Sequence, residues 1–249
     1  MSGLLLHLSG PVQSWGSEAE FEVRTTYRWP TRSALAGLFA CALGRPRGSD
    51  NRDLEELRYT IRVDRPGQRE MDFHTVGGGY PRHLTPPTAE GKFRKAGEGT
   101  ILTQRWYLTD AAFTVAVTGP AAVTEMVGKA LRRPVFSLYL GRRSCTPDTP
   151  ILLFDQVVDA VADLDRLPVH RATSRRGPRQ AVTFIYDTAP EPGALPDGEV
   201  RDIPAGGTRS AFSRRPMWER QRELPGAPDS GLGTQWINAL TAYRQEVTA

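Results

Sequence analysis

The order of apolar segments in the first 155 residues constrains the fold more than any other feature of this sequence. The first segment is a strand-length apolar run, Leu4–Leu8, and the Gly10-Pro11 pair that follows ends it. The spacing of apolar residues then predicts a helix, two strands, a longer strand, a second helix and a last strand, at residues 33–42, 59–64, 71–76, 105–117, 121–131 and 151–154. This order predicts an α+β, ferredoxin-like (RRM-like, β-α-β-β-α-β) domain over residues 1–165.

Two further regions show no such periodicity. Residues 77–104 start with three consecutive glycines and continue with basic residues and prolines, between predicted strands at 71–76 and 101–108. We interpret this region as a flexible, basic excursion that could form an extended hairpin. Residues 166–249 predict one strand at 182–186, an irregular extension rich in Arg, Pro and Gly, and a loosely attached helix at 235–247.

The cationic residues are unusual in kind rather than in number. Only three of the 32 are lysines, so the chain carries 29 arginines at a net charge of +4. Guanidinium groups bind phosphate in a bidentate manner and stack on aromatic rings, which ammonium groups do not do. A GC-rich genome, whose codons favour arginine, would also explain the bias, so the clustering of the arginines matters more than their count.

Several classes of protein are disfavoured by what the sequence lacks. No apolar run reaches the ~18 residues that a membrane helix needs, and no signal peptide is apparent, so we expect a cytoplasmic protein without membrane contact. Two cysteines without a His-Cys cluster argue against a disulfide or a zinc site. No cofactor motif is present. Metal-free RNA cleavage by His74 with Tyr80 and Lys92 remains an alternative that the sequence does not exclude.

Nucleic-acid binding is favoured by the region between the first strand and the first helix. This region, residues 10–31, reads as a long loop, and the start of the next helix adjoins it. Its candidate contacts are planar donors, guanidinium groups, a hydroxyl and an indole, contributed by Gln13, Trp15, Arg24, Arg28, Arg32 and Ser33. Such side chains hold splayed single-stranded RNA. Trp15 fits a stacking role and a core role equally well.

A second candidate follows the second helix. Residues 139–145 combine one aromatic ring, a glycine that permits close approach, two arginines and a hydroxyl, in Tyr139, Gly141, Arg142, Arg143 and Ser144. A surface turn with solvated arginines is the alternative interpretation. The nearby pair Arg132-Arg133 is better explained as complementing the dipole at the end of a helix.

Five motifs in order resemble a known family. They are GPVQSWG (10–16), PTRSALAGL (30–38), DFHTV (72–76), YLTDA (107–111) and YLGRRSC (139–145). In these motifs the chain resembles the CasD subunits of type I-E CRISPR Cascade complexes, members of the RAMP superfamily. Beyond residue 150 the resemblance becomes weak.

The resemblance implies a non-catalytic subunit that caps the 5′ handle of the crRNA in an antiviral ribonucleoprotein complex. An RRM-like palm would hold the RNA, and an inserted thumb, at 77–104 in this chain, would press on the guide. The implied partners are the repeated backbone subunit, the large subunit and, indirectly, target double-stranded DNA. The implied RNA contacts add His74 and Arg105 to the residues above, and the thumb would contribute Tyr80, Arg82, Lys92, Arg94 and Lys95. Type I-C relatives cleave the repeat RNA themselves, which keeps a metal-independent endoribonuclease as the alternative.

Overall fold

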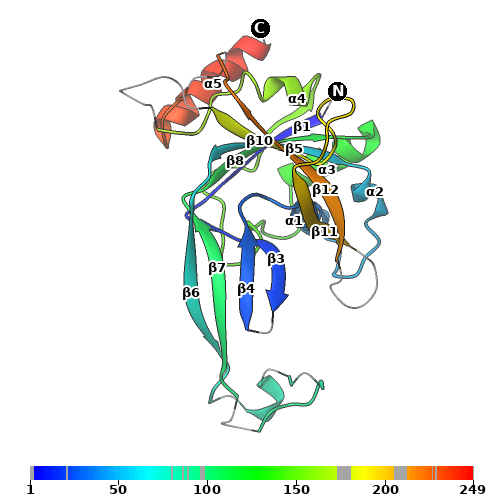
Figure 1. Cartoon of the computed structure of the whole chain (residues 1–249), viewed down its shortest axis with the longest axis vertical. Coiled ribbons are helices and arrows are strands. Elements are labelled where there is room, and N and C mark those ends of the chain that lie inside the picture. Colours follow the sequence, from blue (N-terminus) through cyan, green and yellow to red (C-terminus); the bar gives the residue numbers. More distant parts are fainter. Residues whose placement is uncertain are drawn as a thin grey trace.

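The structure is a computed structural model of the chain, and it contains two β-sheets with helices on both faces of the larger one (Figure 1). It describes residues 3–20, 22–79, 81–85, 87–88, 90–95, 99–172, 181–204, 212–225, 227 and 229–248. Within these residues the larger sheet has seven strands and the smaller one has five. The expected α+β class is confirmed.

Four antiparallel strands form one side of the larger sheet and end at its edge strand β9, in the order β5 (Arg58–Arg65), β8 (Ala112–Thr118), β1 (Gly3–Ser9) and β9 (Leu152–Val157). Helix α1 (Arg32–Ala42) lies between β1 and β5 in the chain, and α3 (Ala121–Arg132) lies between β8 and β9. The short helices α2 (Arg52–Glu55) and α4 (Ala160–Asp163) complete this part.

The uniformly apolar character of β1 follows from burial on both of its faces. Leu4, Leu6 and Leu8 belong to the core that also contains residues of α1 and α3, whereas Leu5 belongs to a second core on the opposite face. Because side chains alternate along a strand, a strand covered on both faces needs apolar residues at every position. His7 and Ser9 are the buried polar exceptions.

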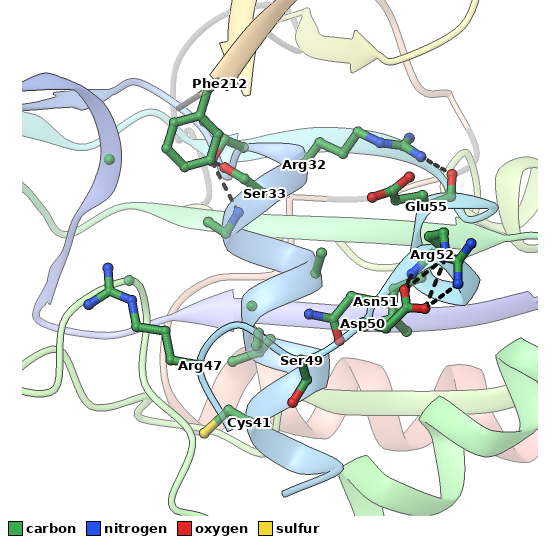
Figure 2. A pocket seen from close by; sticks show the side chains of 18 of the residues that line it. Arg32, Ser33, Cys41, Arg47, Ser49, Asp50, Asn51, Arg52, Glu55 and Phe212 are labelled. Carbon is green, nitrogen blue, oxygen red and sulfur yellow. Dashed lines mark hydrogen bonds and ion pairs between the residues drawn. The ribbon is translucent and has the colours of Figure 1, made fainter. Parts of the chain in front are cut away.

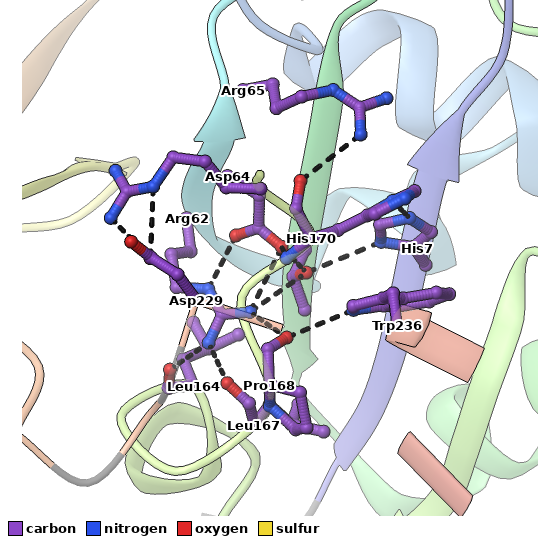
Figure 3. A network of polar contacts seen from close by, with 12 residues as sticks. His7, Arg62, Asp64, Arg65, Leu164, Leu167, Pro168, His170, Asp229 and Trp236 are labelled. Carbon is purple, nitrogen blue, oxygen red and sulfur yellow. Dashed lines mark hydrogen bonds and ion pairs between the residues drawn. The ribbon is translucent and has the colours of Figure 1, made fainter. Parts of the chain in front are cut away.

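His7 is accommodated by the C-terminal helix α5 (Thr234–Thr248) (Figure 3). Its Nε2 lies 2.9 Å from Nδ1 of His170, and the buried Trp236 ring stacks on both imidazoles, with centroids 4.2 and 4.5 Å away. Burial lowers the pKa of His7 to about 3 and that of His170 to about 4. The helix is therefore anchored in the core, and the expectation of a loosely attached helix was wrong.

A fully buried ion pair lies beside the histidines (Figure 3). Arg62 donates from Nε to Asp64 at 2.6 Å, and its terminal nitrogens donate to the carbonyls of Leu164, Leu167 and Pro168. Burial disfavours the charge of Asp64, but Arg62 outweighs it and the pKa of Asp64 is lowered. The pair thereby fastens the segment after α4 to the sheet.

The described part of the C-terminal region continues the larger sheet, so the expectation of an irregular extension was wrong for residues 198–204 and 212–222. Strand β10 (Val182–Tyr186) occurs where the sequence predicted it, and it pairs with β5. The two strands β11 (Gly198–Pro204) and β12 (Phe212–Arg222) were missed, and they extend the sheet beyond β10. Their arginines and prolines obscure the alternation of apolar and polar residues that identifies a strand in a sequence. In the fold, Arg214 and Arg220 are neutralised by Glu199 and Asp197. These strands join the same sheet as residues 1–165.

The smaller sheet replaces the long loop expected after β1. Residues 10–31 contain β2 (Val12–Gln13) and the hairpin of β3 (Trp15–Glu20) and β4 (Val23–Tyr27). Both β2 and β4 pair with β7 (Ile101–Thr109), which also pairs with β6 (Gln68–Val76). The β3–β4 hairpin is favoured because the edge of β7 provides backbone groups with which β2 and β4 can pair.

The long β6–β7 hairpin differs from the expectation at one end and agrees at the other. Strand β6 does not pair with β5, although only Pro66-Gly67 separates the two strands, and it pairs with β7 instead. The predicted strand 105–117 is divided at Asp110, whose φ of 53° is incompatible with a strand. At the far end the stems pair through Val76 and Ile101, as expected, and the single-turn 3-10 helix η1 (Arg82–Leu84) lies in the excursion between them. Among the described residues no helix is long and apolar enough to cross a membrane.

Candidate nucleic-acid interface

The N-terminus of α1 is held by residues from the C-terminal strands. Thr31 caps the helix by accepting the Ala34 N–H, and the Arg32 N–H donates to Oδ2 of Asp202 at 2.7 Å. The Arg32 guanidinium pairs with Asp187 at 2.7 Å and is only 12% exposed. The predicted RNA contact at Arg32 is therefore not supported, because this cation is already neutralised inside the protein.

Two other predicted RNA contacts lie in the core. Trp15 is fully buried and meets Phe113 edge to face, with its indole N–H donating to Oε1 of Gln13 at 3.1 Å. Gln13 is also fully buried, and its amide donates to the carbonyls of Ala111 and Leu8. Neither side chain has surface to offer to RNA, so both predictions were wrong. The indole N–H of Trp15 and the amide of Gln13 instead form hydrogen bonds with other buried polar groups.

A groove of about 700 Å³ runs beside α1 (Figure 2). Ser33 lies near the start of the helix, Cys41 lies near its end, and Arg47 extends from the segment that follows. Tyr139 and Gly141 contribute to the lining from the loop after α3. Burial raises the pKa of the Cys41 thiol, while the nearby positive charge of Arg143 opposes that shift. The groove is thus bordered by hydroxyl groups, guanidinium groups, the rings of Tyr139 and Phe212, and the carboxylates of Asp50 and Glu55.

The loop at 139–145 is rigid and closed on itself. The Leu140 N–H donates to the Cys145 carbonyl at 2.7 Å, and both residues are fully buried. The Ser14 N–H donates to the Leu140 carbonyl at 3.0 Å. Gly141 has a φ of 88°, and a Cβ there would lie 1.7 Å from the Ser14 carbonyl oxygen. This glycine is required by contact with β2–β3, which is a packing reason and not the approach of a ligand.

The arginines of this loop point to two different surroundings. The Arg142 guanidinium lies 4.5 Å from the centroid of the Tyr107 ring and donates from Nη2 to the Arg24 carbonyl, while its buried Nη1 has no hydrogen-bond partner. Arg143 and Ser144 are exposed. Neither arginine has a carboxylate partner among the described residues. The loop therefore places cations between the α1 groove and the smaller sheet.

Further cations lie on the smaller sheet. Arg24 on β4 is directly beside Arg105 on β7, in a parallel register, and Arg28 is exposed just after β4. Arg105 donates to Oγ1 of Thr103, and His74 lies 3.6 Å from Asp72. In the described part of the chain, the three arginines form no ion pair. Like charges on adjacent strands repel, so this arrangement favours an anion between them.

The excursion at the end of the hairpin carries most of its predicted cations at the surface. Arg82 and Lys95 are exposed, Arg94 is half-buried, and Lys92 pairs with Glu90 at 3.1 Å. Tyr80, also predicted here, lies outside the described residues. No group of residues able to hold a metal ion occurs in the parts of the chain that the structure describes.

Sequence reasoning missed two contributors to this region. Arg47 follows the end of α1 in the segment GRPRG, a basic stretch that could have been noticed. Tyr107, whose ring contacts the Arg142 guanidinium, belongs to the YLTDA motif. Nothing in the sequence indicates that a residue 35 positions later would lie over this ring. Only the pairing of β7 with β2 and β4 brings these segments together.

Comparison with known proteins gives consistent results. Residues 3–225 match the family described as CRISPR-associated protein (Cas_Cas5). The CRISPR system Cascade subunit CasD of Escherichia coli (strain K12) is 36% identical over 169 residues, which cover 61% of this chain and 70% of that protein. A chain of a CRISPR RNA-guided surveillance complex superposes with a TM-score of 0.82 at 40% identity, covering 98% of this chain and 99% of that one. A Cas protein crystal structure gives a TM-score of 0.67 at 32% identity, with coverages of 90% and 97%.

Proposed function

The chain belongs to the Cas5 family of CRISPR-associated proteins, and we propose that it is a non-catalytic, cytoplasmic subunit of a type I-E Cascade complex that binds the 5′ handle of crRNA. The observation that carries this proposal is the group of arginines around the 139–145 loop that have no carboxylate partner among the described residues. They lie between a groove of about 700 Å³ and the smaller sheet. Phosphate groups are the ligands that such guanidinium groups bind best.

The proposed palm is the ferredoxin-like part of the larger sheet. Its support is the antiparallel order β5-β8-β1-β9 with α1 and α3 as the two connections, which is the β-α-β-β-α-β arrangement. The proposed thumb is the end of the β6–β7 hairpin with residues 77–104. Strands β10, β11 and β12 then widen the palm and hold α1 through Asp187 and Asp202.

A single-stranded RNA end suits the region better than a duplex. The cations of this region lie on one side of a narrow sheet and on the loop beside the groove, and single strands are held by basic grooves together with rings on which bases stack. Tyr139 lines the groove and is half-buried, so its ring remains accessible. The backbone subunit and the large subunit are the proposed protein partners, and base pairing by the guide would read the target DNA.

RNA binding is tested with two double variants, each of which replaces two arginines that are consecutive in the sequence. We expect Arg142→Ala with Arg143→Ala to weaken binding of RNA with the repeat-derived 5′ sequence by about 10- to 100-fold and to make its salt dependence shallower. The matched control is Arg132→Ala with Arg133→Ala, which removes the same charge at the end of α3, where Arg132 pairs with Asp155. Equal affinity losses in the two double variants would refute a specific role for the loop.

The endoribonuclease alternative has a separate test. His74 has Asp72 as its polar neighbour, and Lys92 pairs with Glu90, so the described residues do not favour a His-Lys arrangement. We expect the chain to leave labelled repeat RNA intact without metal. Cleavage that disappears in His74→Ala would overturn the non-catalytic assignment while leaving RNA binding in place.

A further inference from the structure

The β6–β7 hairpin has two chemically different faces. Residues directly opposite in an antiparallel pair share a face, and the register places Met71 opposite Trp106, Phe73 opposite Gln104, and Thr75 opposite Leu102. On this face Met71, Phe73 and Leu102 are 45%, 59% and 44% exposed, which is unusual for large apolar side chains on one short ribbon. Arg105, the candidate RNA contact, lies on the opposite face. We call the first face the apolar face.

The outer edge of the same hairpin is also open. Strand β6 pairs with β7 over nine consecutive residues without a register shift, and it pairs with no other strand in the described part of the chain. Figure 1 shows β6 at the margin of the molecule, with β7 between it and β4. Proteins usually protect long edge strands with prolines, bulges or charged side chains. Strand β6 has no proline and no bulge, and its acidic residues Glu70 and Asp72 lie on the face opposite Met71 and Phe73. The edge therefore presents unpaired backbone groups next to the apolar face.

We propose that an extended segment of another protein subunit adds to the edge of β6 as a further strand, with apolar side chains at alternate positions against Met71 and Phe73. Backbone N–H and C=O groups at strand spacing are matched by another strand, and alternate side-chain contacts give such strand additions their specificity. RNA matches them poorly, because its phosphates need donors that the exposed side chains of Met71, Phe73 and Leu102 do not supply. The proposal rests on the chain being part of a multiprotein complex, as the proposed function holds.

Amide hydrogen exchange of residues 68–76 tests this proposal in three samples: the free chain, the chain with repeat-derived RNA alone, and the whole guide-loaded complex. The outward amides of β6 should exchange rapidly in the first two samples and about 100-fold more slowly in the complex. Equal exchange in all three samples would overturn the proposal. Protection by RNA alone would assign the face to RNA, and protection in the concentrated free chain would assign it to a second copy, so both results would also overturn it.

A pair of variants adds a second, independent readout. Phe73→Lys places a charge on the apolar face, and Leu195→Lys places the same charge at an exposed site elsewhere, where Leu195 is 82% exposed. We expect both variants to unfold like the parent chain, and only Phe73→Lys to lower incorporation into the complex, by about 10-fold. Equal incorporation of the two variants would contradict the proposal, as would a loss that follows lower stability.

The same data separate this inference from the proposed function. Failure of the chain to bind repeat-derived RNA, with β6 still protected in the complex, would refute handle binding and support the added strand. RNA binding that protects the 139–145 loop, with β6 exposed in every sample, would do the reverse. An added lysine on an RNA-binding face would strengthen RNA binding, so an unchanged RNA affinity of Phe73→Lys supports a protein partner.

Discussion

The C-terminal part of the larger sheet and the smaller sheet with the 139–145 loop are both rich in arginine, but they use it differently. In the larger sheet the arginines meet carboxylates, in the pairs Arg171–Asp229, Arg215–Asp202, Arg220–Asp197 and Arg222–Asp165. In the smaller sheet and the loop, Arg24, Arg28, Arg105, Arg142 and Arg143 have no carboxylate partner among the described residues. The first set is internally neutralised, and the second leaves its charge for an external anion.

This difference explains why an arginine count alone is a weak guide to nucleic-acid binding. A guanidinium that already shares a bidentate contact with a carboxylate must break that contact before it binds phosphate. Arg215 donates from both Nε and Nη2 to Asp202, which in turn holds the first turn of α1. In the proposed RNA binding Arg215 would therefore act only indirectly, because it fixes the helix that borders the groove.

The largest effect is expected from the most deeply buried paired arginine. Arg62→Met leaves Asp64 as an uncompensated buried charge, so we expect a loss of about 3–5 kcal/mol in the free energy of unfolding, measured by urea denaturation. Arg52→Met is the matched control, because it also removes an arginine paired with an aspartate two residues away, but at an exposed site. That control should cost less than about 1 kcal/mol. Similar losses in both would contradict the contrast between buried and exposed pairs.

The second expected effect is a loss of folding stability as the pH is lowered. In the native state His7 and His170 have pKa values of about 3 and 4, below the 6.5 of a free imidazole, because burial disfavours their charged forms. The unfolded chain therefore binds more protons than the folded one between pH 6.5 and these values, so stability falls as the pH is lowered through this window. The expected slope is about 1.4 kcal/mol per pH unit for each histidine.

Urea denaturation at pH 7, 6, 5 and 4.5 measures this dependence. The charged groups around the imidazoles are Asp64, Asp110, Asp148, Arg62 and Arg65. His74→Gln serves as the control, because His74 is half-exposed on the hairpin and lies outside the His7–His170 pair. A flat stability between pH 7 and 4.5 would contradict the assignment.

Local pattern was a good guide where side chains alternate or repeat regularly. The run Leu4–Leu8, the α1 face with Leu35 and Leu38, and the stems at 71–76 and 101–108 all form the predicted elements. Strands β11 and β12 were missed because their exposed positions carry arginines and prolines. The carboxylates that pair with these arginines are distant in sequence. Such pairing depends on tertiary neighbours that no local window contains.

The candidate site shows the same limit for single residues. Gln13 and Trp15 have the chemistry of RNA contacts, yet β7 and the Ala111 carbonyl bury them. Arg32 and Arg28 are four residues apart and look alike in the sequence, but only Arg32 meets Asp187 from the end of β10. Residue type identifies what a side chain is able to bind, whereas burial and the nearest carboxylate decide whether it remains available.

The smallest effect is also the most direct test of the comparison between the two regions. Arg24→Ala with Arg28→Ala removes two unpaired arginines, and Arg214→Ala with Arg220→Ala removes two that pair with Glu199 and Asp197. We expect the first variant alone to weaken binding of repeat-derived RNA, by about 10-fold, and to make the slope of log K against log salt shallower by about 1.4, since each phosphate contact on a single strand contributes about 0.7.

Both variants lose the same net charge, so any long-range attraction of RNA falls equally in the two. The unfolding midpoint should stay within a small margin of the parent in each, because exposed ion pairs contribute less than about 1 kcal/mol. Fluorescence anisotropy at several salt concentrations measures the affinity and its slope together. If the Arg214 and Arg220 variant loses as much affinity and slope as its counterpart, carboxylate pairing does not decide which arginines bind RNA, and the distinction between the two regions fails.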